Sequence, residues 1–221
     1  MYIIKLITGL LVSYLLGSIP TAYIAGKVLK GVDLRTCGSG NLGATNAFRV
    51  LGKNAGTAVL LIDILKGTIA VIVAANLFYS ENALVSMNFY ICLAAISVVS
   101  GHNWTIFLGF KGGKGIATSL GALIAFTLII PHFFLIIISV VTLWLTIFIT
   151  SGYVSLASII ASVFLPVIAF FLQVPIEILI FLSILGIFSL IRHKSNINRL
   201  LRKEEHRFNT RIFLSKIFKK S

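Results

Sequence analysis

Charged side chains are scarce in this chain of 221 residues, because Asp, Glu, Lys and Arg together make up only 11% of it. Acidic residues are the rarest, with six Asp and Glu against 19 Lys and Arg, while hydrophobic residues reach 58%. A soluble domain usually carries about 25% charged residues. The composition therefore excludes an ordinary soluble domain and indicates one integral membrane domain over residues 1–221.

Cysteine is also scarce, since the chain has only Cys37 and Cys92. Two widely separated cysteines favour neither a disulfide framework nor a metal site, so we expect no metal. The first apolar run lacks the small-residue cleavage site of a signal peptide and is too long for one. We therefore expect it to be retained as a membrane span.

The apolar runs have the lengths of bilayer spans rather than of soluble helices. They cover residues 3–25, 55–75, 88–101, 116–130, 133–150, 153–172 and 176–191. This pattern predicts an all-α bundle of seven transmembrane helices. Two runs are short, and only Pro131 and His132 interrupt residues 116–150. Five spans with re-entrant or interfacial segments therefore remain an alternative.

Basic residues gather in three segments beside the spans, at residues 26–54, 101–118 and 192–221. With seven crossings all three segments lie on one face, and the acidic links 76–87 and 173–177 lie on the other. The positive-inside rule then places the N-terminus outside and the basic tail 192–221 in the cytoplasm. Such placement argues against nucleic acid as a partner, and the lysine-rich end, 216–220, is expected to contact anionic lipid headgroups.

Residues 101–115 interrupt the apolar pattern with a histidine, two lysines and several glycines. Glycines allow the backbone to approach a ligand closely, and lysines beside free N–H groups form an anion site. We therefore predict a phosphate site at Lys111, Gly112, Gly113, Lys114 and Gly115. A Walker-type nucleotide site is excluded, because Gly115 rather than Ser or Thr follows Lys114.

A second polar segment, GSGNLGATN at 38–46, precedes Arg49. Its glycines match the pattern G-x-G-x-x-G, but no strand pattern precedes them, so a dinucleotide site is rejected. The guanidinium of Arg49 suits two phosphate oxygens, and hydroxyls and amides beside it come from Ser39, Asn41, Thr45 and Asn46. The alternative is a tight connection in which Thr45 or Asn46 caps the next helix.

A third polar segment directly follows the last apolar run. If that helix continues, Arg192, Asn196 and Arg199 share one face. An ordinary basic stop at the headgroups explains Arg192, but it explains His193 and Asn196 poorly.

Asp63 and Lys66 lie three residues apart inside the second apolar run. Ionisable groups are costly in lipid and should face the bundle interior, paired with each other or with a polar site. A structural ion pair and support for a cytoplasmic pocket both remain open.

These segments resemble the PlsY-type acyl-phosphate:glycerol-3-phosphate acyltransferases of bacteria. Residues 17–20, 38–49 and 63–67 look like one conserved region of that family, residues 101–118 a second, and residues 192–205 a third. The likeness spans nearly the whole chain. The chain departs from the family at Thr105, where proline is common, and at Lys203, where many members have glycine.

The resemblance implies transfer of a fatty acyl group from acyl phosphate to the sn-1 hydroxyl of glycerol 3-phosphate, giving lysophosphatidic acid and phosphate. The reaction would belong to phospholipid synthesis at the cytoplasmic face of the bacterial inner membrane. No cofactor is expected, because acyl phosphate is already activated. Expected partners are both substrates, membrane lipids and the acyl-phosphate-forming enzyme. An organic-phosphate transporter and a non-catalytic lipid-binding or scaffold protein are the alternatives.

We therefore predict four catalytic residues, namely Ser39, His102, His193 and Asn196. The predicted substrate-binding residues are Gly40, Asn41, Thr45, Asn46, Arg49, Lys111, Gly112, Gly113, Lys114, Gly115 and Arg199. Supporting roles are predicted for Asp63, Lys66 and Glu205. Either His102 or a substrate phosphate oxygen accepts the proton, and no Ser-His-Asp arrangement supports an acyl-Ser39 intermediate. The three segments should converge on one pocket.

Overall fold

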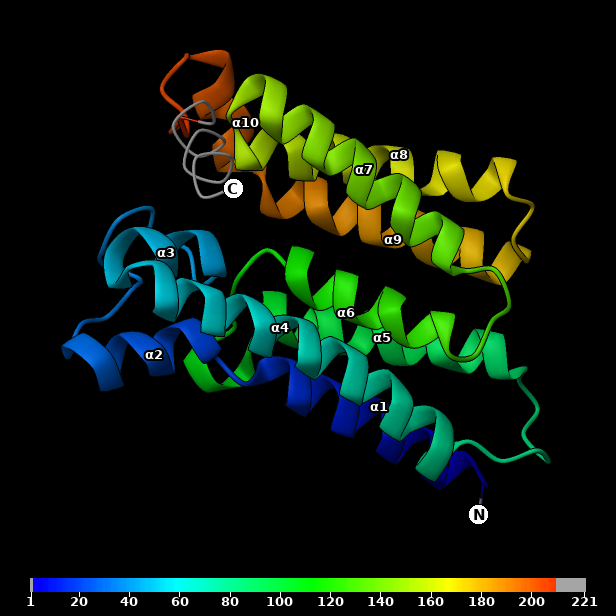
Figure 1. Cartoon of the computed structure of the whole chain (residues 1–221). Helices are drawn as coiled ribbons and strands as arrows, with labels where there is room; N and C mark the ends of the chain where they lie inside the picture. The colour runs from blue at the N-terminus through cyan, green and yellow to red at the C-terminus, as the bar shows by residue number, and fades with distance from the viewer. Residues whose placement is uncertain (1, 210–221) are drawn as a thin grey trace, which may run out of the picture.

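The computed structural model describes residues 2–209, which form α-helices and two short helical turns with no strand among them. Figure 1 labels the α-helices. Their bounds are α1 Tyr2–Ser18, α2 Thr21–Lys30, α3 Ala44–Leu51, α4 Lys53–Val73, α5 Met87–Asn103, α6 Ile116–Thr127, α7 Phe134–Ser151, α8 Val154–Phe171, α9 Ile176–Arg192 and α10 Lys194–Leu201. The π-helical turn η1 covers Ala74–Phe78, and the 3-10 turn η2 covers Ile106–Leu108. The lysine-rich end, 216–220, lies outside the described residues.

Each predicted apolar run is helical, but the helices differ in their ability to cross a bilayer. Five segments are long and apolar enough, and α9 with α10 adds a sixth if this pair, bent by 59°, counts as one span. Helix α6 has 12 residues, which is about 18 Å of helix against a hydrocarbon core of about 30 Å. The protein is thus an all-helical bundle with five or six candidate spans in its described part.

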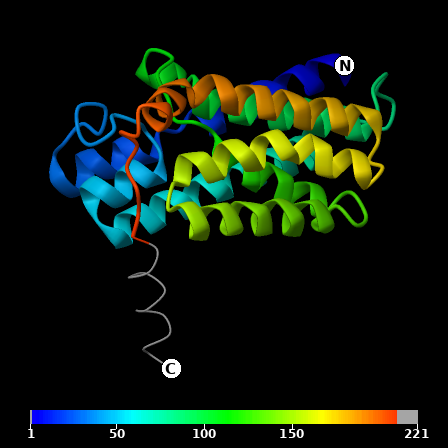
Figure 2. The same ribbon diagram turned by 90° about the horizontal axis from the view of Figure 1, so that it is seen from above.

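The three basic segments lie at one end of the bundle. Figure 1 shows α2, α3 and α10 together on the left, and the loop 109–115 reaches the same end. The turns 79–86, 128–133 and 172–175 lie at the opposite end, as the view from above confirms (Figure 2). We call the first the basic end. The charge pattern predicted that the three basic segments would lie together at one end.

The first predicted span is interrupted. Helix α1 ends at Ser18 and α2 begins at Thr21, because Pro20 has no backbone N–H and cannot continue the helical hydrogen bonds. The break leaves the carbonyl of Ile19 available, and Lys66 Nζ donates a hydrogen bond to it at 3.0 Å. The predicted span 3–25 corresponds to one candidate membrane span, Tyr2–Lys30, and the short break inside it provides a partner for a buried lysine.

Two helix pairs approach so closely that only glycine fits between them. A Cβ on Gly121 of α6 would meet the carbonyl oxygen of Ile64 on α4, and a Cβ on Gly67 of α4 would meet that of Thr118 on α6. Thr68 Oγ1 also donates to the carbonyl of Gly121 at 2.8 Å. Small residues at such contacts are how membrane helices pack backbone to backbone.

The pair α1 and α5 repeats this arrangement. A Cβ on Gly17 would meet the carbonyl of Val98, and one on Gly101 would meet the carbonyl of Tyr14. Because Gly101 precedes His102 directly, this close contact fixes the end of α5 that carries the predicted histidine.

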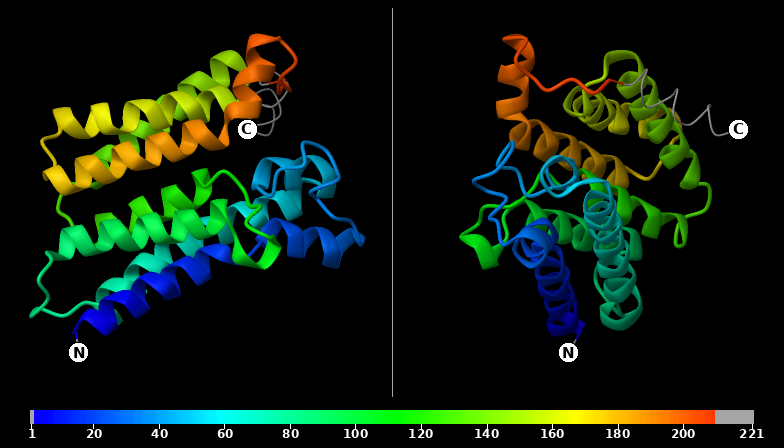
Figure 3. Two further views of the ribbon diagram at one scale, coloured as in Figure 1. Left: turned by 180° about the vertical axis from the view of Figure 1, so that it is seen from behind. Right: turned by 60° about the vertical axis from the view of Figure 1, so that its left-hand side comes forward.

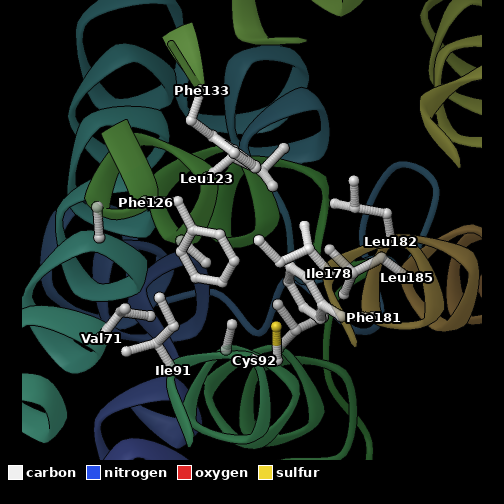
Figure 4. Packing of buried hydrophobic residues seen from close by; sticks show 14 of the residues in the cluster. Val71, Ile91, Cys92, Leu123, Phe126, Phe133, Ile178, Phe181, Leu182 and Leu185 are labelled. Carbon is white, nitrogen blue, oxygen red and sulfur yellow. The ribbon is translucent and has the colours of Figure 1, made fainter. Parts of the chain in front are cut away.

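The main hydrophobic core is formed by residues of α4, α5, α6, α7, α8 and α9 and lies deeper in the bundle than the basic end. Figure 4 shows Phe126 of α6 between Phe133 and Phe181, with Val71 and Ile91 nearby. The ring centroid of Phe126 lies 5.2 Å from that of Phe133 and 5.2 Å from that of Phe181. Such aromatic packing closes the interior at this level.

We expect Gly121→Ala to destabilise the protein, because the new methyl group would force α6 away from α4. Overpacking of this kind costs about 1–3 kcal/mol. Thermal unfolding of the purified protein in detergent measures the effect. Val163→Ile, which adds one carbon on an exposed face of α8, is the control and should unfold at the unchanged temperature. Equal melting temperatures for both variants would contradict the backbone contact.

Candidate active site

A cavity of about 410 Å³ extends from the basic end into the bundle. All three polar segments reach it, although they lie far apart in the sequence. The residues that line it include Ser39, Arg49, His102, Lys114, His193 and Asn196. The predicted convergence of the three segments on one pocket is therefore confirmed.

Asn46 holds the first polar segment in shape. Its Oδ1 accepts a hydrogen bond from the backbone N–H of Ser39 at 2.9 Å, and its Nδ2 donates to the carbonyls of Leu34 at 3.1 Å and Cys37 at 3.0 Å. This side chain is fully buried, so its polar atoms serve the loop and present Ser39 to the cavity. It lines the cavity together with Asn41 and Thr45, whereas Gly40 does not.

The alternative role of Thr45 or Asn46 as a helix cap was wrong. Helix α3 is preceded by Gly43, and no side chain caps its first turn. Asn46 instead lies inside the helix and points back to the loop. The Asn46 side chain therefore stabilises the preceding loop by hydrogen bonds to its backbone and does not cap the helix.

The loop 109–115, which we call the lysine loop, is held from both sides. The N–H groups of Gly112 and Gly113 donate to the carbonyls of Asn103 and His102 at 3.2 and 3.0 Å. Arg192 donates to the carbonyls of the same glycines, from Nη2 to Gly112 at 2.8 Å and from Nε to Gly113 at 2.9 Å. These two amides are therefore engaged within the protein and do not face the cavity.

Lys114 and Gly115 line the main cavity, whereas Lys111, Gly112 and Gly113 do not. Lys111 is exposed. The glycines allow the loop to lie against α5, since a Cβ on Gly112 would meet the carbonyl of His102 and one on Gly113 would meet Nε2 of His102. The sequence pattern located the loop but did not identify which of its residues face the cavity.

Asp63 and Lys66 form the buried ion pair that was one of the two expectations, with Nζ 2.8 Å from Oδ1. Thr21 donates its hydroxyl hydrogen to the same oxygen. His102 Nδ1 lies 3.7 Å from it, and Asp63 lines the cavity beside His102. The pair thus also supports the pocket, so the two interpretations describe one arrangement.

The third segment does not continue the last helix, so the condition under which Arg192, Asn196 and Arg199 would share one face is not met. The chain bends by 59° between α9 and α10, and His193 at the bend has its Nδ1 2.8 Å from the carbonyl of Ser189. Arg192 therefore lies on the lysine loop, away from Asn196 and Arg199. It is neither a headgroup anchor nor part of their face. Sequence reasoning missed its role because the glycine carbonyls it binds lie 79 and 80 residues away.

Asn196 connects the lysine loop to the C-terminal segment. Its Oδ1 accepts a hydrogen bond from Lys114 Nζ, and its Nδ2 donates to Oε1 of Glu205 at 2.8 Å. Arg199 Nε donates to Oε2 of Glu205 at 2.7 Å, and Ser155 Oγ to Oε1 at 3.1 Å. Burial alone would raise the pKa of Glu205, but the hydrogen bonds from Arg199 and Asn196 outweigh it and lower the pKa.

Lys114 is the cation whose charge this environment weakens most clearly. The pKa of its ammonium is lowered to about 8, chiefly by burial; the carboxylate of Glu205 raises it, whereas the charges of Arg199, Arg192 and Arg49 lower it. Lys114, Arg49 and Arg199 line this end of the cavity, and the carboxylates that also line it, Asp63 and Glu205, are already paired with Lys66 and Arg199. Such a site favours an anion that neutralises it.

Residues 202–209, the tail strap, run from α10 across the basic end to the turn between α7 and α8 (Figure 3). Phe208 N donates to the carbonyl of Gly152 at 2.8 Å, and Arg207 Nε to that of Ser151 at 3.0 Å. His206 and Phe208 line the cavity. No motif in the sequence pointed to these two residues.

Both departures from the family pattern have a structural account. Lys203 adopts φ +59°, a left-handed conformation that glycine takes freely and other residues take at about 1–2 kcal/mol. The chain therefore reaches Glu205 despite the missing glycine. Thr105 has φ −70°, within the range of proline, and its hydroxyl donates to the carbonyl of Ser18 at 2.6 Å.

The deeper half of the cavity is apolar. Its lining includes Leu123, Val140, Trp144, Leu165, Leu185 and Phe188. Two serines at mid-depth direct their hydroxyls to the helix backbone, from Ser158 to the carbonyl of Val154 at 2.8 Å and from Ser162 to that of Ser158 at 2.7 Å. The cavity is thus cationic at the basic end and suited to a hydrocarbon chain below it.

The family model, the similar sequences and the similar structures all point to the same protein family. Residues 7–203 match the family model described as glycerol-3-phosphate acyltransferase. The chain is 41% identical to the glycerol-3-phosphate acyltransferase of Synechocystis over 92% of this chain and 90% of the relative. It is also 41% identical to that of Aquifex aeolicus, over 89% of this chain and 95% of the relative.

Two crystal structures are similar to this fold. One is PlsY, an integral membrane glycerol 3-phosphate acyltransferase, in its glycerol 3-phosphate form. It is 39% identical with a TM-score of 0.82, covering 95% of this chain and 98% of that one. The lysophosphatidic acid form of PlsY is 38% identical with a TM-score of 0.78, covering 93% and 96%.

Proposed function

Because this chain belongs to the glycerol-3-phosphate acyltransferase family and is therefore an acyltransferase, we propose that it moves a fatty acyl group from acyl phosphate to the sn-1 hydroxyl of glycerol 3-phosphate. The products are lysophosphatidic acid and phosphate. One observation carries this proposal: the cavity joins a cationic, polar end to an apolar end. One phosphorylated water-soluble substrate and one phosphorylated lipid match it. The organic-phosphate transporter was the wrong alternative, since the relatives are acyltransferases.

Substrate phosphate is held at the polar end by Lys114 and Arg49, both of which line the cavity. Helix α6 begins after Gly115 with no side-chain cap, and Ile116 and Ala117 line the cavity. Amides in the first turn of a helix have no partner within the helix, so they add donors for an anion. The backbone donors are thus at the start of α6, and not at Gly112 and Gly113 as the sequence suggested.

In the reaction, the glycerol hydroxyl oxygen attacks the acyl carbon, the bond from that carbon to the phosphate oxygen breaks, and inorganic phosphate leaves. Both substrates are anionic, so the cations lower the repulsion between them and stabilise the departing charge. Ser39, His193 and Asn196 position the substrates, with Asn41, Thr45 and Arg199 beside them. Asp63 and Lys66 orient His102, which accepts the hydroxyl proton, a role that a substrate phosphate oxygen can also fill.

The basic end faces the cytoplasm of the bacterial inner membrane, so both substrates bind from that side. The N-terminus lies outside, and seven helices each cross the bilayer, namely α1, α4, α5, α6, α7, α8 and α9. Helix α6, the shortest of these, packs chiefly against α4. The acyl-phosphate-forming enzyme would deliver the lipid donor to this face.

The activity is tested with purified protein in detergent, labelled glycerol 3-phosphate and palmitoyl phosphate. We expect labelled lysophosphatidic acid to form without added cofactor. His102→Gln, which keeps the side-chain polar but removes a titrating base, should reduce turnover about 100-fold or more if His102 takes the proton. Near-normal turnover would assign that proton to a substrate phosphate. Absence of product from the unmodified protein would contradict the proposed reaction.

The pH dependence of kcat/KM tests the role of Lys114. Its ammonium is charged below its pKa of about 8 and loses its proton above that value, so phosphate binding should weaken as pH rises through about 8. Lys114→Arg should keep its charge and move this decline to higher pH. Lys114→Ala should lower kcat/KM at neutral pH by about 10- to 100-fold, since a charge-assisted hydrogen bond contributes about 1.5–3 kcal/mol. A profile identical in all three proteins would remove Lys114 from the site.

Cysteine labelling in intact cells tests the orientation. Cys37 is first replaced by serine, and single cysteines are placed at three exposed positions, Lys30 and Arg202 of the basic end and Asn82 of the opposite end. A reagent that does not cross membranes should label only position 82. Labelling of position 30 or 202 from outside would refute a cytoplasmic basic end.

A further inference from the structure

The apolar half of the cavity ends at a buried aliphatic residue on each of four helices. On α6 the lining stops at Leu123 and on α8 at Leu165, while on α7 and α9 it begins at Val140 and Leu185. Helices α6 and α8 run inward from the basic end and α7 and α9 run back, so these four residues meet from opposite directions. All four are buried members of one hydrophobic cluster.

Helices α7 and α8, which are joined by a short turn at the basic end, give the depth of this cavity. On α8 Leu165 lies 11 residues after Val154, where the lining begins, and on α7 Val140 lies 11 residues before Ser151 at the basic end. At 1.5 Å per residue, both correspond to about 16 Å. On these two helices the lining therefore ends about 16 Å from the turn that joins them.

The bottom is closed by aromatic rings. Figure 4 shows Phe126 and Phe133 next to Leu123, and Phe181 next to Leu185. Phe126, Phe133 and Phe181 are each at most 2% exposed, and none of them lines the cavity. Close-packed rings in contact with one another leave no room for a chain to extend further.

Above this bottom, Ala161 keeps the passage open. It lies one helical turn before Leu165 on α8, lines the cavity and is buried. Because its side chain is a single methyl group, it leaves the width that a hydrocarbon chain needs. A larger side chain here would shorten the cavity by about one turn, or about 5 Å.

We propose that Leu165 and Ala161 set the longest acyl chain that the enzyme accepts. Leu165 forms the bottom with Leu123, Val140 and Leu185, and Ala161 admits the chain to it. This inference rests on the proposed function, because it places the acyl group in the apolar half. It assigns chain-length selection to residues remote from the reacting atoms.

The experiment measures kcat/KM with octanoyl, dodecanoyl, palmitoyl and stearoyl phosphates. Ala161→Leu should leave octanoyl transfer within about twofold of the unmodified protein and lower palmitoyl transfer at least tenfold, since single methylenes in an apolar pocket change rates by about 10-fold or more. Leu165→Ala should act in the opposite direction and raise the ratio of stearoyl to palmitoyl transfer. Val163→Phe, a large addition on the exposed face of the same helix, is the control and should leave all ratios unchanged.

Equal losses at every chain length in Ala161→Leu, or no change in either variant, would overturn the proposal. Thermal stabilisation by lysophosphatidic acids of the same chain lengths provides a second readout that needs no turnover. If the unmodified protein transfers no acyl group, the proposed reaction fails. The length dependence of stabilisation then still decides whether Ala161 and Leu165 limit the chain.

Discussion

Buried charge is the constraint on which the rest of this structure depends. Inside a bundle that spans lipid, an ionised group without an internal partner is costly. The ammonium of Lys66 has two acceptors, the carboxylate of Asp63 and the carbonyl of Ile19 at the break before Pro20. Thr21, the first residue after the break, donates to the same carboxylate. The break in the first span and the ion pair in the second are therefore one feature, and His102 lies against it.

Three cations of the polar end, Arg192, Lys114 and Arg199, are held by acceptors within the protein. Arg192 binds the carbonyls of Gly112 and Gly113, and Lys114 and Arg199 are connected through Asn196 and Glu205. Such connections restrict the side chains before any ligand arrives, and a pre-organised site needs little rearrangement when charge shifts during a reaction. Close glycine contacts between α4 and α6 and between α1 and α5 provide the same restriction for the backbone.

Much of this could be predicted from the sequence, because apolar length and basic clustering are local signals. They predicted the helical class, the positions of the helices within a few residues and the common end of the basic segments. Convergence of Ser39, His102, Lys114, His193 and Asn196 also followed from residue chemistry and the family resemblance. Features that depend on contacts distant in sequence did not follow. Arg192 was read as an anchor, Gly112 and Gly113 as phosphate donors, and the bend at His193 was not foreseen.

The tail strap places the last part of the site at the far end of the chain. A polypeptide synthesised only as far as Leu201 contains every α-helix described here but lacks Glu205, to which Asn196 and Arg199 donate. Membrane insertion and helix packing can thus precede assembly of the polar network. During biosynthesis the polar network therefore stays incomplete until residues 202–209 have left the ribosome and folded back over the bundle.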